Sequence, residues 1–562
     1  MDGVQGPRLL CASTNNAVYQ KRSYIDPRGD LYFSFMKKLN DLEYLKLSKP
    51  QALLYNIQTF FCSIPGWIKR LFAAILSFFK NCALAVKEEF LDISHTFIKG
   101  NWAVKLSFLI FGFGNLYYGQ IMRGVLFLLF EIVFIVYMFV PFGAGQLGTG
   151  LHWLGKCNWF QTGSTVGTVQ GGTVYDPNLD MYVRVDGDDS VRVLLYGLLT
   201  VIFIIGFIGT WRMQVKQCRI CMDITAKGKK IKSGKDDIKS LLDDQFHKTL
   251  LTPSLMGILL FTVLPIIYMV IVAFTNYDYK HDGYANLFRW VGLENFNSIT
   301  DFGEGGLGLV FGELLGWTLM WAIFATFSNY FLGMIVAMMI NKKGIRLKKV
   351  WRTVLVMTIA IPQFVSLLYI SKMFGATGMI GNLIDDIPFI KDYLLANYYQ
   401  DVWKSPVISK ILLVVINIWV GIPYVMLMAT GILMNIPADL YESAKIDGAS
   451  GVQQFTKITL PYMLFVTGPY LLTSFVGNLN NFNIIYLLTG GGPTNLEMGV
   501  INGVEVGHTD LLITWLFKLT AGGDPKYYLA SVVGILIFVV VAVLSLVVYN
   551  VIPSTKNEED YS

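Results

Sequence analysis

The sequence predicts an all-α protein that crosses a membrane several times. Apolar runs recur along the 562 residues, and many reach the roughly twenty residues that cross a ~30 Å hydrocarbon core. Charged residues make up 15% of the chain, below the ~25% of ordinary soluble domains. The runs are continuous, which favours helices that satisfy their own backbone hydrogen bonds in lipid over the alternating strands of a β-barrel.

The first apolar segment is the weakest candidate for a membrane span. Residues 103–119 are short for a crossing, carry Lys105 and are interrupted by Gly112, Gly114 and Asn115. We therefore expect a re-entrant or interfacial helix there and about eight transmembrane helices in total. The other apolar segments are 123–142, 192–211, 252–275, 311–340, 351–373, 407–434, 462–488 and 528–552.

The distribution of basic residues predicts how these helices are oriented. Cytoplasmic loops carry an excess of Lys and Arg, and both the connection 341–352 and the linker 212–248 are rich in them. The loops poor in Lys and Arg, which we expect outside, are 143–190, 276–310 and 374–405. Alternation then predicts a multi-pass protein of the cytoplasmic membrane with both termini cytoplasmic. The net charge of +6 calls for no nucleic-acid partner, since cytoplasmic Lys and Arg account for it.

The flanks of the apolar region divide the chain further. Residues 1–100 are predicted to form a cytoplasmic N-terminal extension without a cleaved leader. Apolar residues at helical spacing in 60–88 indicate an amphipathic helix that either lies on the inner leaflet or packs against the bundle. Accessory membrane helices are expected in 101–248, with 143–190 as an exposed, Gly-rich and β-prone outer loop. Residues 553–562 are expected to form a cytoplasmic tail.

The sequence lacks the motifs of common enzymes. It has no GxxxxGK[ST] phosphate loop and neither HExxH nor GxSxG. We therefore expect a transport subunit, with any ATP hydrolysed by a partner. Cys218 and Cys221 form a lone CxxC with no second ligand pair nearby, so reduced thiols are expected, with a redox or metal role as the alternative. No metal or cofactor is expected to bind this chain.

A charged stretch between two apolar runs, YESAKIDGASGVQQFTKITLP, has an ordered pattern of its own. A helix is expected from Asp439 to Ile446, a turn at the following Asp-Gly-Ala, and a second short helix over 452–458, before Pro461 starts the next span. An ordinary polar loop needs no such order. We expect a docking element whose exposed Glu442 meets a partner's arginine and whose apolar residues fill a groove.

This stretch contains the pattern E-x-A-x-x-D-G-A-x(8)-I-x-L-P and resembles the EAA loop of ABC importer permeases. The matching residues are Glu442, Ala444, Asp447, Gly448, Ala449, Ile458, Leu460 and Pro461. The resemblance implies that 437–461 is the coupling loop, which docks into a cleft of the ATPase subunit. It implies that Glu442, Ala444, Asp447, Gly448 and Ala449 carry that coupling.

The resemblance extends to the permease subunits of maltose and maltodextrin importers of the MalF type. It rests on Thr252–Asp278, Trp290–Phe296, Asn480–Asn495 and Gly507–Leu519. It implies that 249–552 is a six-helix permease core of the MetI-like, type I kind. Loop 276–310 is much shorter than the large periplasmic domain of some members, so a binding-protein contact through such a domain is not carried over.

Polar residues form two stripes within the predicted spans, where such residues are costly and often functional. Asn417, Gly421 and Tyr424 fall at i, i+4 and i+7, and Ser474, Asn478 and Asn481 repeat that spacing, so each set shares one helix face. Asn amides both donate and accept hydrogen bonds, which suits sugar hydroxyls, and a Tyr ring can face an apolar sugar surface. The alternative is that these residues hold helices together.

The resemblance implies that the sugar site lies on these two helices. The matching positions are Asn417, Val420, Gly421, Tyr424, Ser474, Gly477, Asn478 and Asn481. The family has an aromatic residue where this chain has Gly477. The absence of that ring is expected to widen the site for a longer or differently linked oligosaccharide, or to weaken binding.

The function implied is that of the transmembrane permease subunit of an ATP-driven importer of maltose or maltodextrin. The implied partners are a second, MalG-like permease subunit, two MalK-like ATPase subunits that bind ATP and magnesium, and an extracytoplasmic sugar-binding protein. Import of a different oligosaccharide is one alternative. The other is an ion-coupled secondary transporter, which predicts an internal repeat and a mid-span acid, for which Glu131 is the main candidate.

Overall fold

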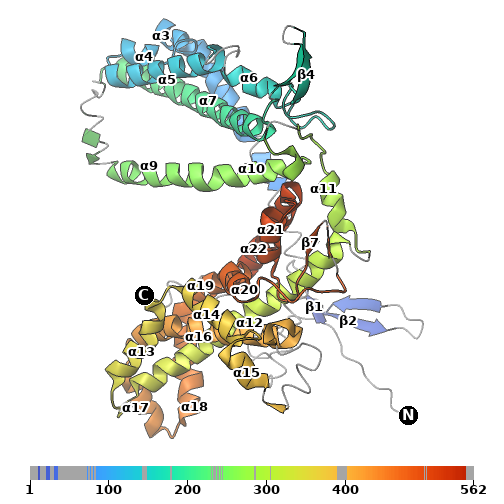
Figure 1. The fold of residues 1–562 in the computed structure, drawn as a ribbon. Helices are drawn as coiled ribbons and strands as arrows, with labels where there is room; N and C mark the ends of the chain where they lie inside the picture. Colours follow the sequence, from blue (N-terminus) through green and yellow to red (C-terminus); the bar gives the residue numbers. More distant parts are fainter. Residues whose placement is uncertain are drawn as a thin grey trace. The chain divides into compact units, whose positions relative to one another are not determined.

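The computed structural model describes most of the chain between residues 84 and 551 and is predominantly helical (Figure 1). The residues left undescribed within that range are 142–148, 178–179, 186, 230, 232–235, 237–238, 241, 244, 284–285, 304–305, 343, 386, 389–400, 499 and 502. Before residue 84, it describes isolated positions in 73–81 and an antiparallel sheet in the order β1-β2-β3. Those strands are β1 Leu10–Ala12, β2 Gln20–Ile25 and β3 Leu31–Phe35.

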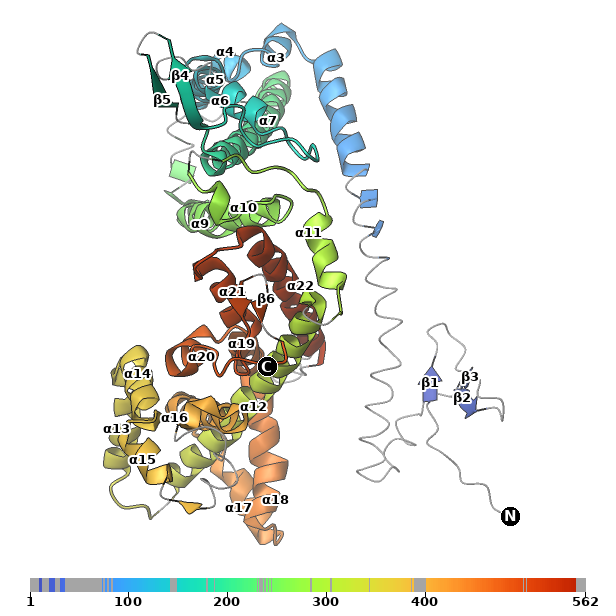
Figure 2. The same cartoon turned by 45° about the vertical axis from the view of Figure 1, so that its right-hand side comes forward.

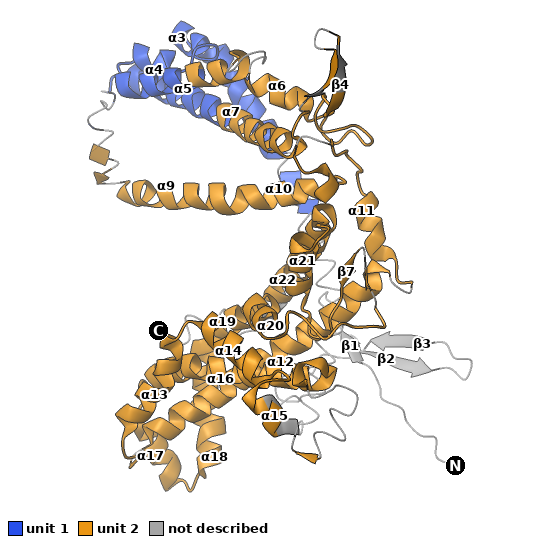
Figure 3. Cartoon of the chain, in the orientation of Figure 1, with its two compact units in different colours: residues 1–131, 209–237 blue, residues 132–208, 238–562 orange. Residues whose placement is uncertain are grey.

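The chain forms two compact units (Figure 3). The first comprises residues 1–131 and 209–237, and the second comprises 132–208 and 238–562. Two long helices, α5 (Ile121–Phe139) and α7 (Ser190–Ala226), contribute to both units.

The first unit shows why the first apolar segment forms no helix of spanning length. It is broken into α3 (Trp102–Leu106) and α4 (Phe113–Tyr117), each of five residues. Gly112, between them, has φ 73°, and a Cβ there would lie 2.2 Å from the carbonyl oxygen of Gly124. Only glycine adopts this conformation readily at so close an approach. The prediction that this segment holds no full span is confirmed.

Residues 84–99 form a helix whose polar side faces the protein. Glu89 and Asp92 pair with Arg212, and Asp92 also pairs with Arg219, both on α7. The opposite side is apolar and exposed, with Phe90 67% and Ile98 73% accessible. The amphipathic helix predicted for 60–88 lies mostly outside the described residues. The contacts between residues 84–99 and α7 therefore leave both alternatives for 60–88 open.

The second unit contains the remaining spans. With α5 and α7, the helices long and apolar enough to cross a membrane include Phe246–Val272 (α9 Phe246–Ile258, η1 Leu259–Val263 and α10 Leu264–Val272), α12 Leu307–Asn341 and α16 Pro406–Leu433. The other two are Gly451–Thr489 (α18 Gly451–Gln454, η6 Phe455–Thr459, α19 Leu460–Leu479 and α20 Phe482–Thr489) and α22 Tyr527–Val551, the latter over Tyr527–Leu546. Among the described residues they number 7, or 8 if one bent pair is counted as a span. This confirms the prediction of about eight.

The bent pair replaces the continuous helix that the apolar run 351–373 suggests. Helices α13 (Lys348–Ala360) and α14 (Gln363–Phe374) meet at 91°. Pro362 has no N–H to continue the helix, and a residue before proline avoids the α region. Ile361 accordingly has φ −82° and ψ 128°. Figures 1 and 2 show the two halves of the span diverging at this point.

Shorter elements connect the spans. The loop 143–190 contains α6 (Thr149–Lys156) and an antiparallel hairpin of β4 (Gly172–Asp176) and β5 (Met181–Val185). The others are η2 Tyr279–His281, α11 Glu294–Asn297, η3 Ser298–Thr300, α15 Met379–Asp385, η5 Val402–Lys404, α17 Ala438–Ile446, β6 Val500–Ile501, β7 Val504–Glu505 and α21 Leu512–Ala521.

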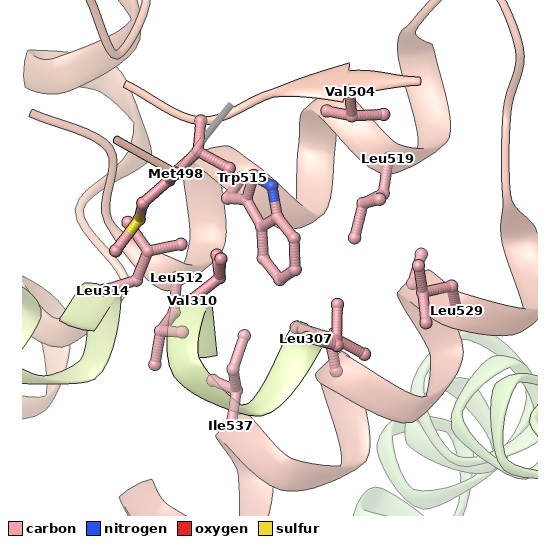
Figure 4. Close-up of a cluster of buried hydrophobic side chains, with 13 residues drawn as sticks. Leu307, Val310, Leu314, Met498, Val504, Leu512, Trp515, Leu519, Leu529 and Ile537 are labelled. Carbon is pink, nitrogen blue, oxygen red and sulfur yellow. The ribbon is translucent and has the colours of Figure 1, made fainter. Parts of the chain in front are cut away.

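Two buried clusters hold the core spans together. In the first, Trp515 of α21 is fully buried among side chains of α12 and α22, including Val310 and Ile537 (Figure 4). In the second, Met426 of α16 and Met463 of α19 (Leu460–Leu479) pack with buried residues of α12. Helix α12 therefore fixes the positions of α16 and α19, the helices that carry the two polar stripes.

Candidate functional site

Residues of the two polar stripes line two cavities. The first, which we call the asparagine cavity, has a volume of about 440 Å³ and is lined by Ser474, Gly477, Asn478 and Asn481. Asn480, Phe482 and Asn483 also line it, together with Gln363. The second, which we call the Trp419 cavity, has a volume of about 380 Å³. Its lining includes Trp419, Val420, Tyr424, Thr358, Ser366 and again Gln363.

The amides of the asparagine cavity are already partly engaged. Asn478 donates through Nδ2 to Oγ1 of Thr326 on α12 at 3.0 Å. Its Oδ1 accepts a hydrogen bond of 3.2 Å from Nδ2 of Asn481. Asn481 in turn caps α20 (Phe482–Thr489), since its Oδ1 accepts from the Ile484 N–H at 3.4 Å. An Asn amide has two donor hydrogens and two acceptor lone pairs. The same residues therefore hold helices together and keep bonding capacity for a ligand.

Gly477 faces open space in this cavity. In the described part of the chain, nothing lies within 4 Å of the position where a Cβ would stand. A Cβ atom at this position would therefore meet no neighbouring atom of the described residues. The space beside Gly477 is therefore part of the cavity.

The stripe on α16 divides between the cavity and the protein interior. Tyr424 is 53% exposed and lines the Trp419 cavity with Val420. Asn417 is only 4% exposed. A Cβ on Gly421 would lie 2.3 Å from Nδ2 of Asn329 on α12, so the space beside Gly421 is filled by that side chain and not by open cavity. The structure therefore brings Val420 and Tyr424 to a cavity and directs Gly421 against α12.

Two buried polar atoms near this contact have no hydrogen-bond partner among the described residues. They are Nδ2 of Asn417 and Oδ1 of Asn329. An unsatisfied buried polar group costs roughly 1–3 kcal/mol.

The charged stretch has a well-defined local structure. Helix α17 ends in a Schellman motif, in which the Ala449 N–H donates to the Ala444 carbonyl at 2.8 Å and the Gly448 N–H to the Lys445 carbonyl at 3.1 Å. Gly448 occupies the left-handed position at φ 77°. The Asp-Gly-Ala of the motif therefore forms the C-terminal end of α17.

The second helix of this stretch is not separate, contrary to expectation. After a capping box between Ser450 and Gln453, α18 (Gly451–Gln454) runs through the π-helical turn η6 (Phe455–Thr459) directly into α19. In that turn the Leu460 N–H bonds to the Phe455 carbonyl. The shifted bonding lets the helix continue past Pro461, which can donate no hydrogen bond. Figures 1 and 2 show α17 and α18 side by side.

The exposed surface of this stretch mixes charge with apolar side chains. Glu442 is exposed. Ile446 is 87% exposed and Val452 72%. The hydroxyl group of Tyr441 lies 2.9 Å from Oγ1 of Thr459, which ties α17 to the base of α19. Apolar residues held outward on an ordered element are typical of a docking surface.

The remaining candidate groups have structural partners. Cys218 and Cys221 are buried, with Sγ atoms 3.6 Å from Oγ of Ser107 and 3.4 Å from Oε1 of Gln120. Glu131 accepts a 2.9 Å hydrogen bond from the Phe111 N–H. No cluster of three or more His, Cys, Asp or Glu side chains suited to a metal occurs among the described residues.

Outside the spans, one carboxylate organises the loop 143–190. Asp188 contacts Lys156 Nζ at 2.5 Å and accepts from the Thr168 and Val169 N–H groups at 2.8 and 3.0 Å. Burial opposes ionisation of Asp188, but these donors outweigh it and hold its pKa below the ordinary value.

Comparison with known proteins defines the class to which these features belong. Residues 329–557 match the family described as "Binding-protein-dependent transport system inner membrane component". The chain is 32% identical over 472 residues to the maltodextrin transport system permease protein MdxF of Bacillus subtilis, covering 83% of this chain and 99% of MdxF. It is 31% identical to the maltodextrin permease MalC of Streptococcus pneumoniae (78% and 93% covered) and 32% identical to the galactooligosaccharide permease GanP of Bacillus subtilis (67% and 86% covered).

The protein is thus a multi-pass permease of an ABC importer, a transport subunit and not an enzyme. More particularly, the chain belongs to the carbohydrate-importer permeases of the MalF type. The sequence-based prediction of this family is confirmed. An ion-coupled secondary transporter is no longer an alternative, and ATP is hydrolysed in such systems by separate subunits.

The structure also brings together residues that the sequence did not single out. Gln363 and Trp419 line the cavities beside the predicted positions. The sequence could have indicated Gln363, because it directly follows a proline inside an apolar run. Proline favours a break in the helix there, and a break within the membrane is tolerated where it lines a cavity. Trp419 lies in an apolar helix and carried no comparable signal.

Proposed function

We propose that this chain forms the membrane pathway for maltodextrin-type α-glucans. The sugar-contacting surface consists of the residues that line the two cavities, namely Val420 and Tyr424 of α16 and Ser474, Gly477, Asn478 and Asn481. The observation that carries the proposal is the asparagine cavity. Four of the eight predicted site residues line it, and its amides retain capacity for sugar hydroxyls. The names of MdxF and MalC support maltodextrin as the substrate. The name of GanP favours galactooligosaccharides as the second candidate.

The proposed assembly follows from the family. A second permease subunit completes the pathway, two ATPase subunits bind ATP and magnesium, and an extracytoplasmic binding protein delivers the sugar. Both termini and the stretch 437–461 lie on the cytoplasmic side. Closure of the ATPases pushes on α17, and the core helices carry that movement to the cavities.

Transport in liposomes tests the substrate. The complete complex is reconstituted with its binding protein and internal ATP, and labelled maltose, longer maltodextrins and galactooligosaccharides are offered separately. ATP-dependent accumulation of α-glucans is expected. Accumulation of galactooligosaccharides alone would overturn the α-glucan assignment and leave the sugar-importer assignment intact.

A charge reversal tests the coupling role of Glu442. Glu442→Lys is expected to leave assembly intact and to uncouple ATP hydrolysis from sugar uptake, because an arginine of the partner would meet a like charge. Glu294→Lys makes the same charge change at an exposed position in α11, outside the loop, and serves as the control. Normal coupling in Glu442→Lys would exclude the docking role.

A further inference from the structure

A third cavity lies among helices that carry neither polar stripe, and we call it the tyrosine cavity. Its volume is about 420 Å³. Its walls are α7, α10, α21 and α22, which contribute Leu195, Met269, Leu516 and Ala530 among others, all from the second unit. Among the described residues that line it, none is charged and none has an amide side chain. It shares no lining residue with the asparagine cavity or the Trp419 cavity.

The walls of the tyrosine cavity are held by two separate buried clusters. In one cluster, Leu194 of α7 packs with Val272 of α10. In the other, Leu519 of α21 packs with Leu529 of α22. The seam between these clusters cannot close unless one of them is disrupted. An empty apolar seam would forfeit the dispersion contacts of its inner faces, so this geometry calls for an occupant.

The polar groups of the cavity favour an apolar occupant. The Tyr268 hydroxyl donates to the Val191 carbonyl at 3.4 Å, and the Thr520 hydroxyl donates to the Phe517 carbonyl at 2.9 Å. A buried water needs about 2–4 polar partners, and a sugar needs more. Hydroxyl groups that already donate within the protein leave few such partners, so neither water nor a sugar suits this lining.

The tyrosine cavity extends over the depth of one lipid leaflet. At one end the rings of Tyr277 and Tyr527 stack with centroids 4.7 Å apart, where α10 has ended and α22 begins. Tyrosine is enriched at the membrane–water interface. From that end the lining follows α10 from Val272 to Leu264, which is roughly 12 Å at a rise of ~1.5 Å per residue. Half of a ~30 Å hydrocarbon core is about 15 Å.

The dimensions distinguish an acyl chain from a helix of a neighbouring subunit. One ~5.4 Å turn of a helix ~10 Å wide fills about 420 Å³. The whole cavity would therefore hold only a single turn, although it extends over more than two turns of α10. A hydrocarbon chain is much narrower than a helix and can lie along the full length of the seam.

The interfacial end of the cavity carries positive charge. The ammonium groups of Lys280 and Lys526 lie 5.7 and 5.4 Å from the centre of the Tyr279 ring, and Lys526 directly precedes the lining residue Tyr527. In the described part of the chain, neither lysine is paired with a carboxylate. The neighbouring Asp278 is engaged by His281 at 2.6 Å. A phosphate has the charge that complements two such lysines.

We propose that the tyrosine cavity binds one acyl chain of a phospholipid, whose phosphate lies near Lys280 and Lys526. The lipid comes from the leaflet on the side of loop 276–310. It fills the seam between α7, which precedes the permease core, and the core helices α10, α21 and α22. The bound lipid therefore joins the accessory helices to the core at a place separate from the sugar-contacting surface.

Retention of a photoreactive lipid tests the proposal. The complete complex is prepared in membranes that contain a phosphatidylethanolamine with a diazirine in one acyl chain. It is then extracted, washed free of bulk lipid with detergent, irradiated and digested for mass spectrometry. The wild type is expected to carry cross-links on the residues that line the cavity.

Variants that fill the cavity from different walls provide the contrast. Leu195→Trp on α7 and Thr520→Phe on α21 are each expected to lose the cross-links, because the larger side chain occupies the place of the acyl chain. Ile205→Trp introduces the same ring on α7 at a position that is 63% exposed and does not line the cavity, and it should keep them. Lys280→Gln combined with Lys526→Gln should retain less lipid than the wild type.

The outcomes decide each part of the proposal. A wild-type complex without cross-links in the cavity refutes it, whether a helix of the second permease subunit fills the cavity or the cavity stays empty. Wild-type cross-linking in both Leu195→Trp and Thr520→Phe also refutes it. Size-exclusion chromatography shows whether each variant assembles, and if one fails to do so, the other decides. Undiminished retention by the double lysine variant refutes the phosphate contact.

Discussion

Gly421 provides a sharp test of how α16 is oriented. The Cβ of an alanine there would lie 2.3 to 2.7 Å from three side-chain atoms of Asn329. Overpacking of this kind costs roughly 1–3 kcal/mol, because α12 and α16 must separate or Asn329 must leave its rotamer. Gly431 lies on the same helix, and the described residues leave the space around its Cβ position open. An alanine at Gly431 is therefore expected to be neutral or slightly stabilising, since alanine is the better helix former.

The measurement is the free energy of unfolding of each variant in detergent micelles, compared by denaturant titration. Gly421→Ala should be about 1–3 kcal/mol less stable than Gly431→Ala. Adding Asn329→Ala should recover most of that difference, since it removes the clashing side chain and the two positions are in contact. If Gly421→Ala is as stable as Gly431→Ala, or if Asn329→Ala does not recover the loss, the orientation of α16 described above is wrong.

Three further predictions concern the cavity, the coupling loop and the outer loop. Gly477→Phe should fold normally, because its Cβ meets open space, and should reduce uptake of long maltodextrins more than of maltose; an unchanged length profile would contradict this. Gly448→Ala should destabilise the turn by about 1–2 kcal/mol, since φ is 77° there. Sugar uptake should then fall more than ATPase activity, and unaltered uptake at full expression would contradict this prediction. Asp188→Asn should lower the melting temperature at pH 7. The pKa of Asp188 is lowered in the folded state. The stabilisation from its ionised carboxylate is therefore fully present above the unfolded pKa of ~3.9 and is lost as pH falls through the folded pKa. The melting temperatures of the wild type and Asp188→Asn should accordingly converge only at pH values below the folded pKa.

Local features could be predicted from the sequence because neighbouring residues produce them. The spans follow from runs of apolar residues, and the end of α17 follows from Gly448 in a Schellman motif whose hydrogen bonds join residues only three to five apart. The short helix α21 was not among the predicted segments, since ten residues are too few to cross a membrane. It becomes recognisable only through the burial of Trp515 against α12 and α22.

The rotation of each helix about its axis was decided only by tertiary packing. The stripe Asn417, Gly421 and Tyr424 is compatible with facing a sugar or facing another helix, because polar and small residues serve both purposes in a membrane. Contact with Asn329 turns Gly421 toward α12 and leaves Tyr424 at a cavity. In the same way, proline chemistry permits a break at Pro362, but the packing of α13 on α16 and of α14 on α20 sets its direction and brings Gln363 to both cavities. The sequence by itself determined the class of transporter and its spans, and the contacts between distant helices determined which polar residues line the cavities.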